Sequence, residues 1–560
     1  MIAGEKVLQL KNNTWQCPLE QTAELQNLLI KLGPFSHVLH LSGLGGAEPR
    51  QDNSLSADEA LMLARRMIAL AQALAHFTHP AKVVFLTEKG QQAKPGEASS
   101  LAVGAVMGLP EVFSGELRHC EFKLVDFDVY NQAQAFAELL SLFEHKVIAW
   151  RGGERLRLGL KQVDFLHETP QGQPFREGDA VLITGGLGGV GFELAKTMMQ
   201  RYRVRLLITG RTVLPAREAW PLILAEGGQS ATRLERLTLL ESLGQVTYCA
   251  LDVSDEKALK QAVEQFEQTH GLRFSGVVHA SGTLAAGGLK DFNPLSLDAA
   301  LKPKCKGTLA ISRVFSAHPS FKFIAISSMA GLLGGNGLAA YSVANAFLTH
   351  FVENTREKNA WVVNYGRWDD IGMAQGRHDQ EALIAQGYIP LSAQDASQAF
   401  LASIERAPAS YYYGLEPAGY LVSLYGEQTA YPQQQTSMLS EQELAAQITA
   451  VFKNLLELDE LNPEANFFDL GVHSLLIPQL KKQLTQQTGH DIPTVEFFRS
   501  TTVNTLTQSL LSKQGDSHTA KHVQAESHSK AANPAVNLSA RRALLAQRGQ
   551  QHTVEFEDGE

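Results

Sequence analysis

Short apolar runs alternate with longer stretches of helical periodicity over most of this chain. Between residues 178 and 375, six such runs are long enough to form buried strands, and helical stretches separate them. Strands that alternate with helices in this way predict a doubly wound parallel sheet. The six predicted strands lie at residues 180–184, 204–209, 246–251, 275–280, 321–327 and 361–365.

Residues 1–150 show the same alternation, with strands predicted at 36–41, 82–87 and 123–127 and a helix at 57–75. The turn after the second strand is followed by polar residues rather than by the glycines of a dinucleotide site. We therefore expect this part to be an α/β scaffold that binds no cofactor.

The C-terminal part loses the strand signals. A polar linker at 431–436 leads into a predicted helical bundle, and residues 513–535 have a composition typical of disorder. Residues 538–550 predict a short basic helix. The pattern thus predicts an α/β scaffold, an α/β cofactor domain, a helical bundle, and a linker with a short helix. Their boundaries are 1–175, 176–430, 437–512 and 513–560.

Composition narrows the function classes. The 560 residues are 44% apolar and carry a formal charge of −9, which argues against a nucleic-acid or anionic-membrane surface. No apolar segment reaches the roughly 18–20 residues that a membrane span needs, so we expect a soluble cytoplasmic protein. The cysteines are scattered without disulfide or metal-site spacing, and we expect no bound metal. They are Cys17, Cys120, Cys249 and Cys305.

A glycine-rich turn follows the first strand of the second α/β region. Gly186-x-Gly188-x-x-Gly191 lies between this strand and a predicted helix, where a pyrophosphate can approach the backbone. A purely structural turn is the alternative. Arg211 follows the second strand, where an arginine suits the 2′-phosphate of NADPH and an acidic residue would suit NADH. A solvated arginine is the alternative there.

The ends of the third and fourth strands add further candidates. Asp252 could meet the adenine amine, and Asp252 or Ser254 could instead cap the next helix. His279 and the residues after it could line the cofactor, although a buried structural histidine is an equal possibility. The candidate cofactor-binding residues are Gly186, Leu187, Gly188, Gly189, Val190, Arg211, Asp252, Val253, Ala280, Ser281 and Gly282.

Four polar residues suit the chemistry of carbonyl reduction. Tyr341 and Asn345 share one side of a predicted helix, and Ser328 ends a strand at the edge that faces the ligand crevice. Hydride transfer to a carbonyl leaves an alkoxide, to which a phenol can donate a proton. The phenol's ordinary pKa of about 10 would fall beside an ammonium such as that of Lys304. Taken alone, each of these residues would be interpreted as a packing or surface residue without a catalytic role.

Taken together, these motifs resemble the ketoreductase of modular polyketide synthases, in the short-chain dehydrogenase/reductase superfamily. The resemblance covers about residues 30–425. It implies a catalytic tetrad in which Tyr341 is the general acid and Ser328 is the hydrogen-bond donor to the carbonyl. Lys304 and Asn345 are its other two members. It also implies two Rossmann-like doubly wound subdomains, the first degenerate. The small all-α bundle predicted from the pattern follows them.

Two positions depart from the family pattern. Leu284-Ala285-Ala286 stands where many members have Leu-Asp-Asp, and Leu333 stands where the opposite stereochemical class often has Trp. Neither marker is present, so the stereochemistry of the product stays open.

The helical bundle contains Leu470-Gly471-Val472-His473-Ser474-Leu475. Ser474 could simply cap the following helix. The segment also resembles an acyl carrier protein, which implies that Ser474 carries 4′-phosphopantetheine. His473 replaces the usual aspartate of that motif.

The combined resemblance implies NADPH-dependent reduction of a β-ketoacyl thioester held on the chain's own carrier. Expected partners are ketosynthase and acyltransferase components, a phosphopantetheinyl transferase, and a downstream synthase that docks on 538–550; a solvated tail is the alternative for that segment. Two rival functions stay open: a catalytically silent reductase scaffold that presents a carrier, and an α-ketoacyl reductase of a hybrid nonribosomal peptide line.

Overall fold

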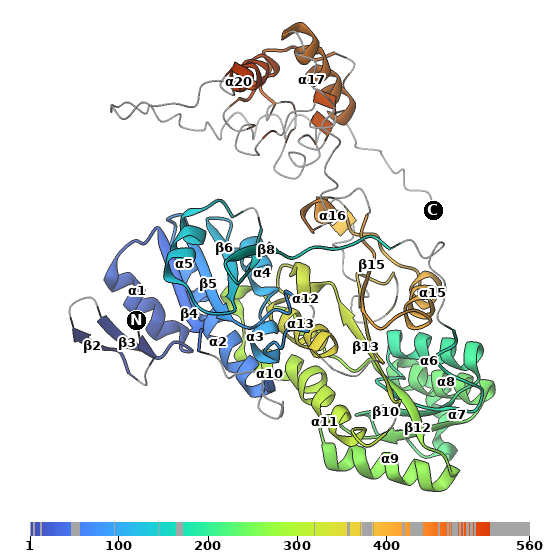
Figure 1. The fold of residues 1–560 in the computed structure, drawn as a ribbon. Coiled ribbons are helices and arrows are strands. Elements are labelled where there is room, and N and C mark those ends of the chain that lie inside the picture. Colours follow the sequence, from blue (N-terminus) through green and yellow to red (C-terminus); the bar gives the residue numbers. More distant parts are fainter. Residues whose placement is uncertain are drawn as a thin grey trace, which may run out of the picture. The chain divides into compact units, whose positions relative to one another are not determined.

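The computed structural model divides the chain into two compact units, Met1–Gln433 and Gln434–Glu560, which we describe separately (Figure 1). The residues that the structure describes are 2–3, 6–11, 14–45, 56–94, 96–143, 145–163, 172–318, 320–354, 359–369, 371, 383–384, 386–416, 420–425 and parts of 441–515.

The first unit contains a parallel seven-stranded sheet in the order β11-β10-β9-β12-β13-β14-β15. The chain starts at β9, runs outward to β11, and then returns to the other side of β9. This reversal confirms the predicted doubly wound sheet, and the point between β9 and β12 is where such sheets bind their ligands. The strands are β9 (Ala180–Thr184), β10 (Arg205–Gly210), β11 (Val246–Ala250), β12 (Phe274–His279), β13 (Lys322–Ser328), β14 (Ala360–Tyr365) and β15 (Ser410–Tyr413).

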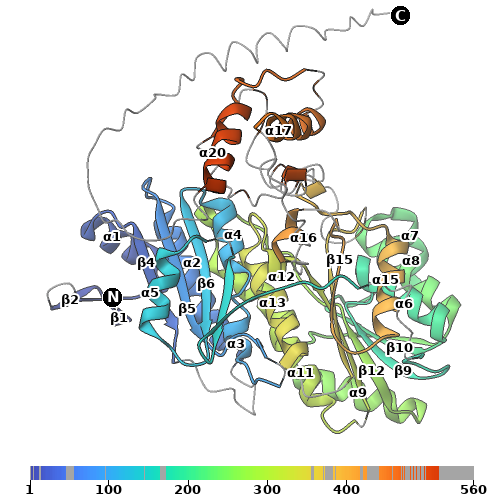
Figure 2. The same cartoon turned by 45° about the horizontal axis from the view of Figure 1, so that its top comes forward.

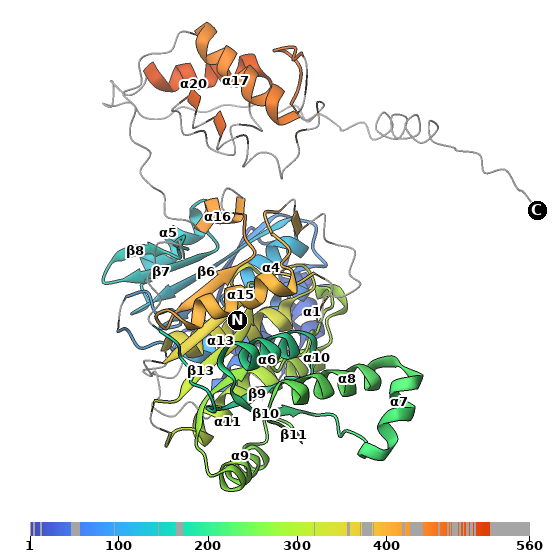
Figure 3. The same ribbon diagram turned by 90° about the vertical axis from the view of Figure 1, so that its right-hand side faces the viewer.

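Helices cover both faces of this sheet, so its central strands are buried apolar runs. One face packs on α6 (Gly189–Tyr202), α7 (Trp220–Glu226), α8 (Gly228–Leu243) and α15 (Ala393–Ile404) (Figure 3). The other face packs on α9 (Glu256–His270), α10 (Pro294–Leu301), α11 (Gly307–Val314) and α13 (Ala339–Asn354).

The cap of α9 differs from both expected candidates. The side chain of Asp255 accepts a hydrogen bond from the backbone N–H of Ala258 at 3.0 Å, so Asp255 is the N-cap. Asp252 and Ser254 lie in the turn that precedes it, where Asp252 accepts hydrogen bonds from Ser254.

The N-terminal half of the first unit contains a five-stranded sheet with the strands in sequence order. Because this order has no reversal, the sheet lacks the crevice at which doubly wound folds bind ligands. The N-terminal half is thus an α/β unit without the strand-order reversal of the seven-stranded sheet, and its lack of a cofactor stays a prediction. The strands are β4 (His37–Gly43), β5 (Ala81–Glu88), β6 (Cys120–Phe127), β7 (Val147–Arg151) and β8 (Glu154–Arg157), of which β8 runs antiparallel to β7.

Three further strands pair in a small separate sheet. They are β1 (Ile2–Ala3), β2 (Leu8–Lys11) and β3 (Thr14–Cys17). The helices of this half are α1 (Thr22–Leu32), α2 (Ser56–Leu74), α3 (Leu101–Gly104), α4 (Leu109–Glu116) and α5 (Gln132–Leu140).

One apolar core runs through both halves of the first unit, and α13 lies within it. Helix α13 lies beside α2, α3 and α4 (Figures 1 and 2), and it also contacts β13 and β14. The close approach of the N-terminal half to α13 depends on glycines. A Cβ at Gly108 would lie 2.5 Å from the carbonyl oxygen of Gly331 and would collide with Oγ of Ser342, and a Cβ at Gly104 would collide with His350. The two halves therefore share α13 as a common core element.

The second unit has a small core between α17 (Glu441–Leu456) and α20 (Val503–Gly515). The stacked rings of Phe452 and Phe467, whose centroids are 4.0 Å apart, lie at its centre. These helices agree with the expected bundle. His473, Ser474, the linker at 431–436 and the basic segment 538–550 lie outside the described residues.

Within the described ranges, no helix is both long and apolar enough to cross a membrane. The same ranges hold no group of three or more His, Cys, Asp or Glu side chains that could bind a metal ion.

We predict that Gly108→Ala lowers stability, because the added methyl group would push α4 away from α13. Overpacking of this kind costs about 1–3 kcal/mol, which thermal and urea unfolding would measure. Gly159→Ala is the control, since its Cβ would meet only an ordinary neighbour at 3.4 Å. Equal unfolding midpoints for the two variants would contradict the packing argument.

Candidate active site

The glycine-rich turn between β9 and α6 is closed by contacts that exclude side chains. A Cβ at Gly191 would collide with the Gly185 carbonyl oxygen and lie 3.0 Å from the Gly186 Cα, and a Cβ at Gly186 would lie 2.8 Å from Ile208 Cγ2. Gly188 is the N-cap of α6. The backbone thus comes close to any ligand here, at a helix N-terminus that favours an anion.

The end of β12 lies against this turn. The backbone N–H of Ser281 donates to Thr184 Oγ1 at 3.3 Å, and a Cβ at Gly185 would lie 3.1 Å from the Ser281 Cα. The structure therefore brings the predicted segment 280–282 together with the glycine turn. Their meeting point is the strand-order reversal between β9 and β12, where a doubly wound sheet binds its ligand.

His279 takes the structural role rather than the cofactor role. Its side chain is fully buried, and Nδ1 shares a hydrogen bond of 2.7 Å with Thr184 Oγ1. Burial, together with the nearby Lys304 ammonium, lowers the pKa of His279 to about 3. The imidazole is therefore neutral at physiological pH and helps to fix the end of β9.

The other cofactor candidates separate into exposed and buried side chains. Arg211 is exposed after β10, so its guanidinium is accessible to a ligand phosphate. Leu187 and Val253 are buried in the apolar cores, which leaves only their backbone groups for a cofactor. Gly189 and Val190, in the first turn of α6, are partly exposed.

Asp252 forms an ion pair with Lys302 at 2.9 Å, although a cofactor contact was expected. Burial by itself would raise the pKa of Asp252, but the hydrogen bond from Ser254 and the contact with Lys302 lower it below its ordinary value. The carboxylate is thus already paired, and the adenine contact stays a prediction.

Three members of the predicted tetrad meet at the carboxyl end of β13. Tyr341 lies in the first turn of α13, and its side chain interacts with those of Ser328 and Asn345. Burial raises the pKa of the Tyr341 phenol, and the contacts with Ser328 and Asn345 lower it by a smaller amount. The phenol therefore holds its proton at neutral pH.

Asn345 is held from two directions. Its Nδ2 donates to the backbone carbonyl of Tyr341 at 2.7 Å, and its Oδ1 accepts from Ser327 Oγ at 3.3 Å. Ser327 also donates to the Asn345 carbonyl at 3.1 Å. No role for Ser327 could be predicted from the sequence, because a buried serine next to Ser328 has no distinctive spacing. The structure shows that Ser327 orients the amide of Asn345.

Lys304 lies in a π-helical turn, Lys302–Lys306, between α10 and α11. Such turns are frequent at functional sites. Its buried ammonium donates to the backbone carbonyl of Ile326 at 2.8 Å, two residues before Ser328. Burial lowers the pKa of Lys304 to about 8. The side chains that lower the pKa of Tyr341 here are Ser328 and Asn345, so the effect of a lysine on the phenol stays a prediction.

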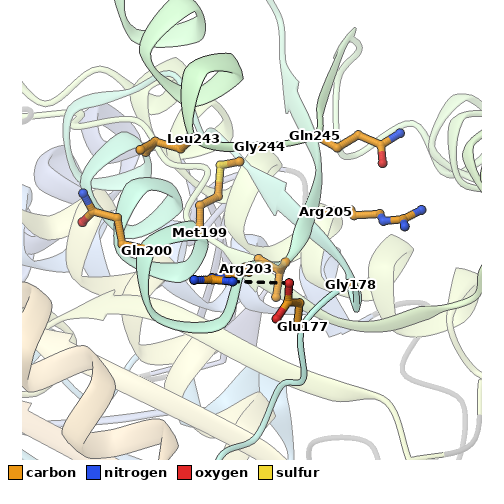
Figure 4. A pocket seen from close by; sticks show the side chains of 10 residues that line it. Glu177, Gly178, Met199, Gln200, Arg203, Arg205, Leu243, Gly244 and Gln245 are labelled. Atoms are coloured by element: carbon orange, nitrogen blue, oxygen red, sulfur yellow. Dashed lines mark ion pairs between the residues drawn. The ribbon is translucent and has the colours of Figure 1, made fainter.

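A surface hollow of about 550 Å³ lies elsewhere on the first unit (Figure 4). Its lining includes Gly178, Arg205 and Gln245, which lie at the amino ends of β9, β10 and β11. Glu177 and Arg203 form an ion pair across it at 3.6 Å. The hollow thus lies at the amino ends of these strands, whereas the glycine turn lies at their carboxyl ends. It is separate from the candidate active site.

Comparison with known families gives two matches. The KR domain matches residues 179–370, and the phosphopantetheine attachment site matches residues 446–510. The first match contains the glycine turn and the tetrad and implies use of NAD(P)H. The second contains Ser474 and supports a phosphopantetheine group on the second unit.

Curated relatives are large synthases. The 6-methylsalicylic acid synthase of Aspergillus terreus is 26% identical over 80% of this chain, and polyketide synthase PksL of Bacillus subtilis is 25% identical over 76%. The chain spans 27% of the first relative and 10% of the second. It is homologous to these synthases.

Solved structures share the fold. The adenylation, ketoreductase and pseudo Asub structure of a keto acid-selecting NRPS module matches 77% of this chain and 36% of that one, with a TM-score of 0.68 and 23% identity. An A1-type ketoreductase matches 70% of this chain and 80% of its own, with a TM-score of 0.57 and 24% identity.

We predict that Gly191→Ala weakens binding of the dinucleotide, because its methyl group would force the turn away from α6. A packing cost of about 1–3 kcal/mol corresponds to roughly a five- to 150-fold rise in the dissociation constant for NADPH, measurable by fluorescence titration. Gly244→Ala is the control at the opposite edge of the sheet, where the Cβ would approach only Met199 Cε at 3.1 Å. Unchanged binding by Gly191→Ala would remove the glycine turn from the cofactor site.

Proposed function

We propose that this chain, which carries a ketoreductase domain and a phosphopantetheine attachment site and is homologous to polyketide synthases, uses NADPH to reduce a β-ketoacyl thioester to a β-hydroxyacyl thioester. The acyl group is held on the chain's own carrier unit. The observation that supports this most is the grouping of Tyr341, Ser328 and Asn345 at the carboxyl end of β13, on the ligand side of the sheet.

The residues present fit a dinucleotide. The tight turn depends on Gly186 and Gly191, whose added side chains would collide with Ile208 and the Gly185 carbonyl, and the N-terminus of α6 offers backbone N–H groups to a pyrophosphate. The exposed guanidinium of Arg211 suits a 2′-phosphate and favours NADPH over NADH. When bound, the nicotinamide supplies a hydride for the carbonyl carbon.

The chain's own residues stabilise and protonate the oxygen that gains charge. Ser328 donates a hydrogen bond to this oxygen, and the phenol of Tyr341 gives it a proton. Burial keeps the phenol protonated until it is needed. Lys304 and Asn345 complete the tetrad: Lys304 fixes the backbone of β13 at Ile326, and Asn345 fixes the backbone of α13 at Tyr341.

The other activities of a synthase would come from separate components. We propose that ketosynthase and acyltransferase components build the keto chain and that a phosphopantetheinyl transferase loads Ser474. The size of the curated relatives, of which this chain spans 27% and 10%, supports such a division of work.

We predict that Tyr341→Phe reduces turnover by about 10²–10⁴-fold, because it removes the proton donor while keeping the ring. Oxidation of NADPH at 340 nm with a β-ketoacyl thioester measures turnover, and fluorescence titration shows that the cofactor still binds. Undiminished turnover by the variant would exclude Tyr341 as the general acid.

The wild-type protein in the same assay distinguishes the rival functions. Reduction of the β-keto substrate supports the proposal, and a preference for the matched α-keto thioester favours the nonribosomal alternative. Binding of NADPH without turnover of either substrate would favour the silent scaffold. Chiral analysis of the product assigns the stereochemistry that the motifs leave open.

We predict that Ser474→Ala abolishes loading of the carrier but leaves reduction of free thioesters unchanged, because the reductase residues all lie in the other unit. Intact-mass measurement after treatment with a phosphopantetheinyl transferase and coenzyme A tests it. Ser500→Ala, in the same unit, is the control that should still be loaded. A phosphopantetheine-sized mass gain in Ser474→Ala would place the group on another residue.

A further inference from the structure

Glu116 is the last residue of α4, in the N-terminal half of the first unit, yet its carboxylate contacts the half that carries the tetrad. Its Oε2 accepts a hydrogen bond from the backbone N–H of Leu289 at 2.6 Å, and its Oε1 accepts one from the N–H of Gly337 at 2.9 Å. These partners are 173 and 221 positions away in the sequence. One side chain thus joins two distant segments.

Both segments border the candidate active site. The first, residues 280–289, begins where the end of β12 meets the glycine turn and ends at Leu289. The second, residues 334–338, leads directly into α13, whose first turn carries Tyr341. The two loops also contact each other, because the N–H of Gly287 donates to the Gly337 carbonyl at 2.9 Å.

Further contacts fix each loop on the N-terminal half. The carbonyl of the buried residue Leu289 accepts a hydrogen bond from Gln72 Nε2 at 2.9 Å, so both of its backbone polar groups are bound by side chains of that half. Gly334 has a φ of +63°, and a Cβ there would lie 2.7 Å from the backbone nitrogen of Val112 on α4. The second loop therefore lies directly against α4.

We propose that Glu116 is a positioning residue that fixes these two loops relative to each other and thereby determines how a keto substrate lies beside Tyr341. The first loop begins beside the glycine turn, and the second ends three residues before Tyr341, so a change in their relative position would change the surroundings of the phenol. The effect on the substrate rests on the proposed reductase function, whereas the two hydrogen bonds can be tested without any substrate.

The first test is hydrogen–deuterium exchange on the full chain, comparing wild type with Glu116→Gln and Glu116→Ala. A hydrogen bond to a charged group protects an amide by about tenfold or more. We expect Glu116→Ala to lose this protection at Leu289 and Gly337. Glu116→Gln, which keeps one acceptor oxygen, should lose part of it. Glu121→Gln removes an exposed carboxylate on β6 and should exchange like wild type.

The second test measures reduction and the chirality of the product. We expect kcat/KM for the thioester to fall by about ten- to a hundred-fold in Glu116→Ala, as small misplacements of a substrate typically cause. The ratio of product enantiomers should also shift. Glu116→Gln should recover part of both, and the dissociation constant for NADPH should match wild type.

Protection at Leu289 and Gly337 that is unchanged in both variants would overturn the proposal. So would lost protection with wild-type kcat/KM and an unchanged enantiomer ratio, because the loops would then not orient the substrate. If wild type itself reduces no keto thioester, the proposed function fails, and the exchange test still decides whether Glu116 holds the loops.

Discussion

The close packing of α13 between the two halves of the first unit is the constraint on which the site depends. Its side chains at 342–352 are buried, and the neighbouring backbones come near enough that a methyl group at Gly108 or Gly104 has no space. Because Tyr341 and Asn345 belong to this helix, any shift of α13 moves the phenol relative to Ser328 on β13. The N-terminal half therefore helps to fix where Tyr341 and Asn345 lie relative to Ser328.

The active site also carries a cost in stability. Burial lowers the pKa of Lys304 from 10.5 to about 8, so the unfolded chain binds that proton more tightly. This difference in the pKa of Lys304 lowers the free energy of unfolding by about 3 kcal/mol below pH 8. The loss of stability is relieved as the pH rises from 8 towards 10.5. Below pH 8 the site keeps a buried ammonium against the Ile326 carbonyl.

Most of the seven-stranded sheet could be predicted from the sequence, because strands buried on both faces form uninterrupted apolar runs. β9 has the predicted bounds, and the neighbouring strands differ from theirs by about one residue. β15, Ser-Tyr-Tyr-Tyr, was missed because it is a half-buried edge strand with neither an apolar run nor an alternating pattern. Tyr341, Ser328 and Asn345 were found through their motif, whereas Glu116 was not, since its partners are backbone groups far away in the sequence. Ser474 was found through its motif and lies within the matched phosphopantetheine attachment site.

The shared core has a consequence for exchanging parts between synthases. A segment cut at residues 175 and 176 would contain the tetrad and the glycine turn, but it would expose the face of α13 that packs on α2, α3 and α4. Apolar surface of that kind promotes aggregation. The transplantable module is therefore the whole of Met1–Gln433, and a chimera is best joined beyond its last core residue rather than where the recognisable motifs begin.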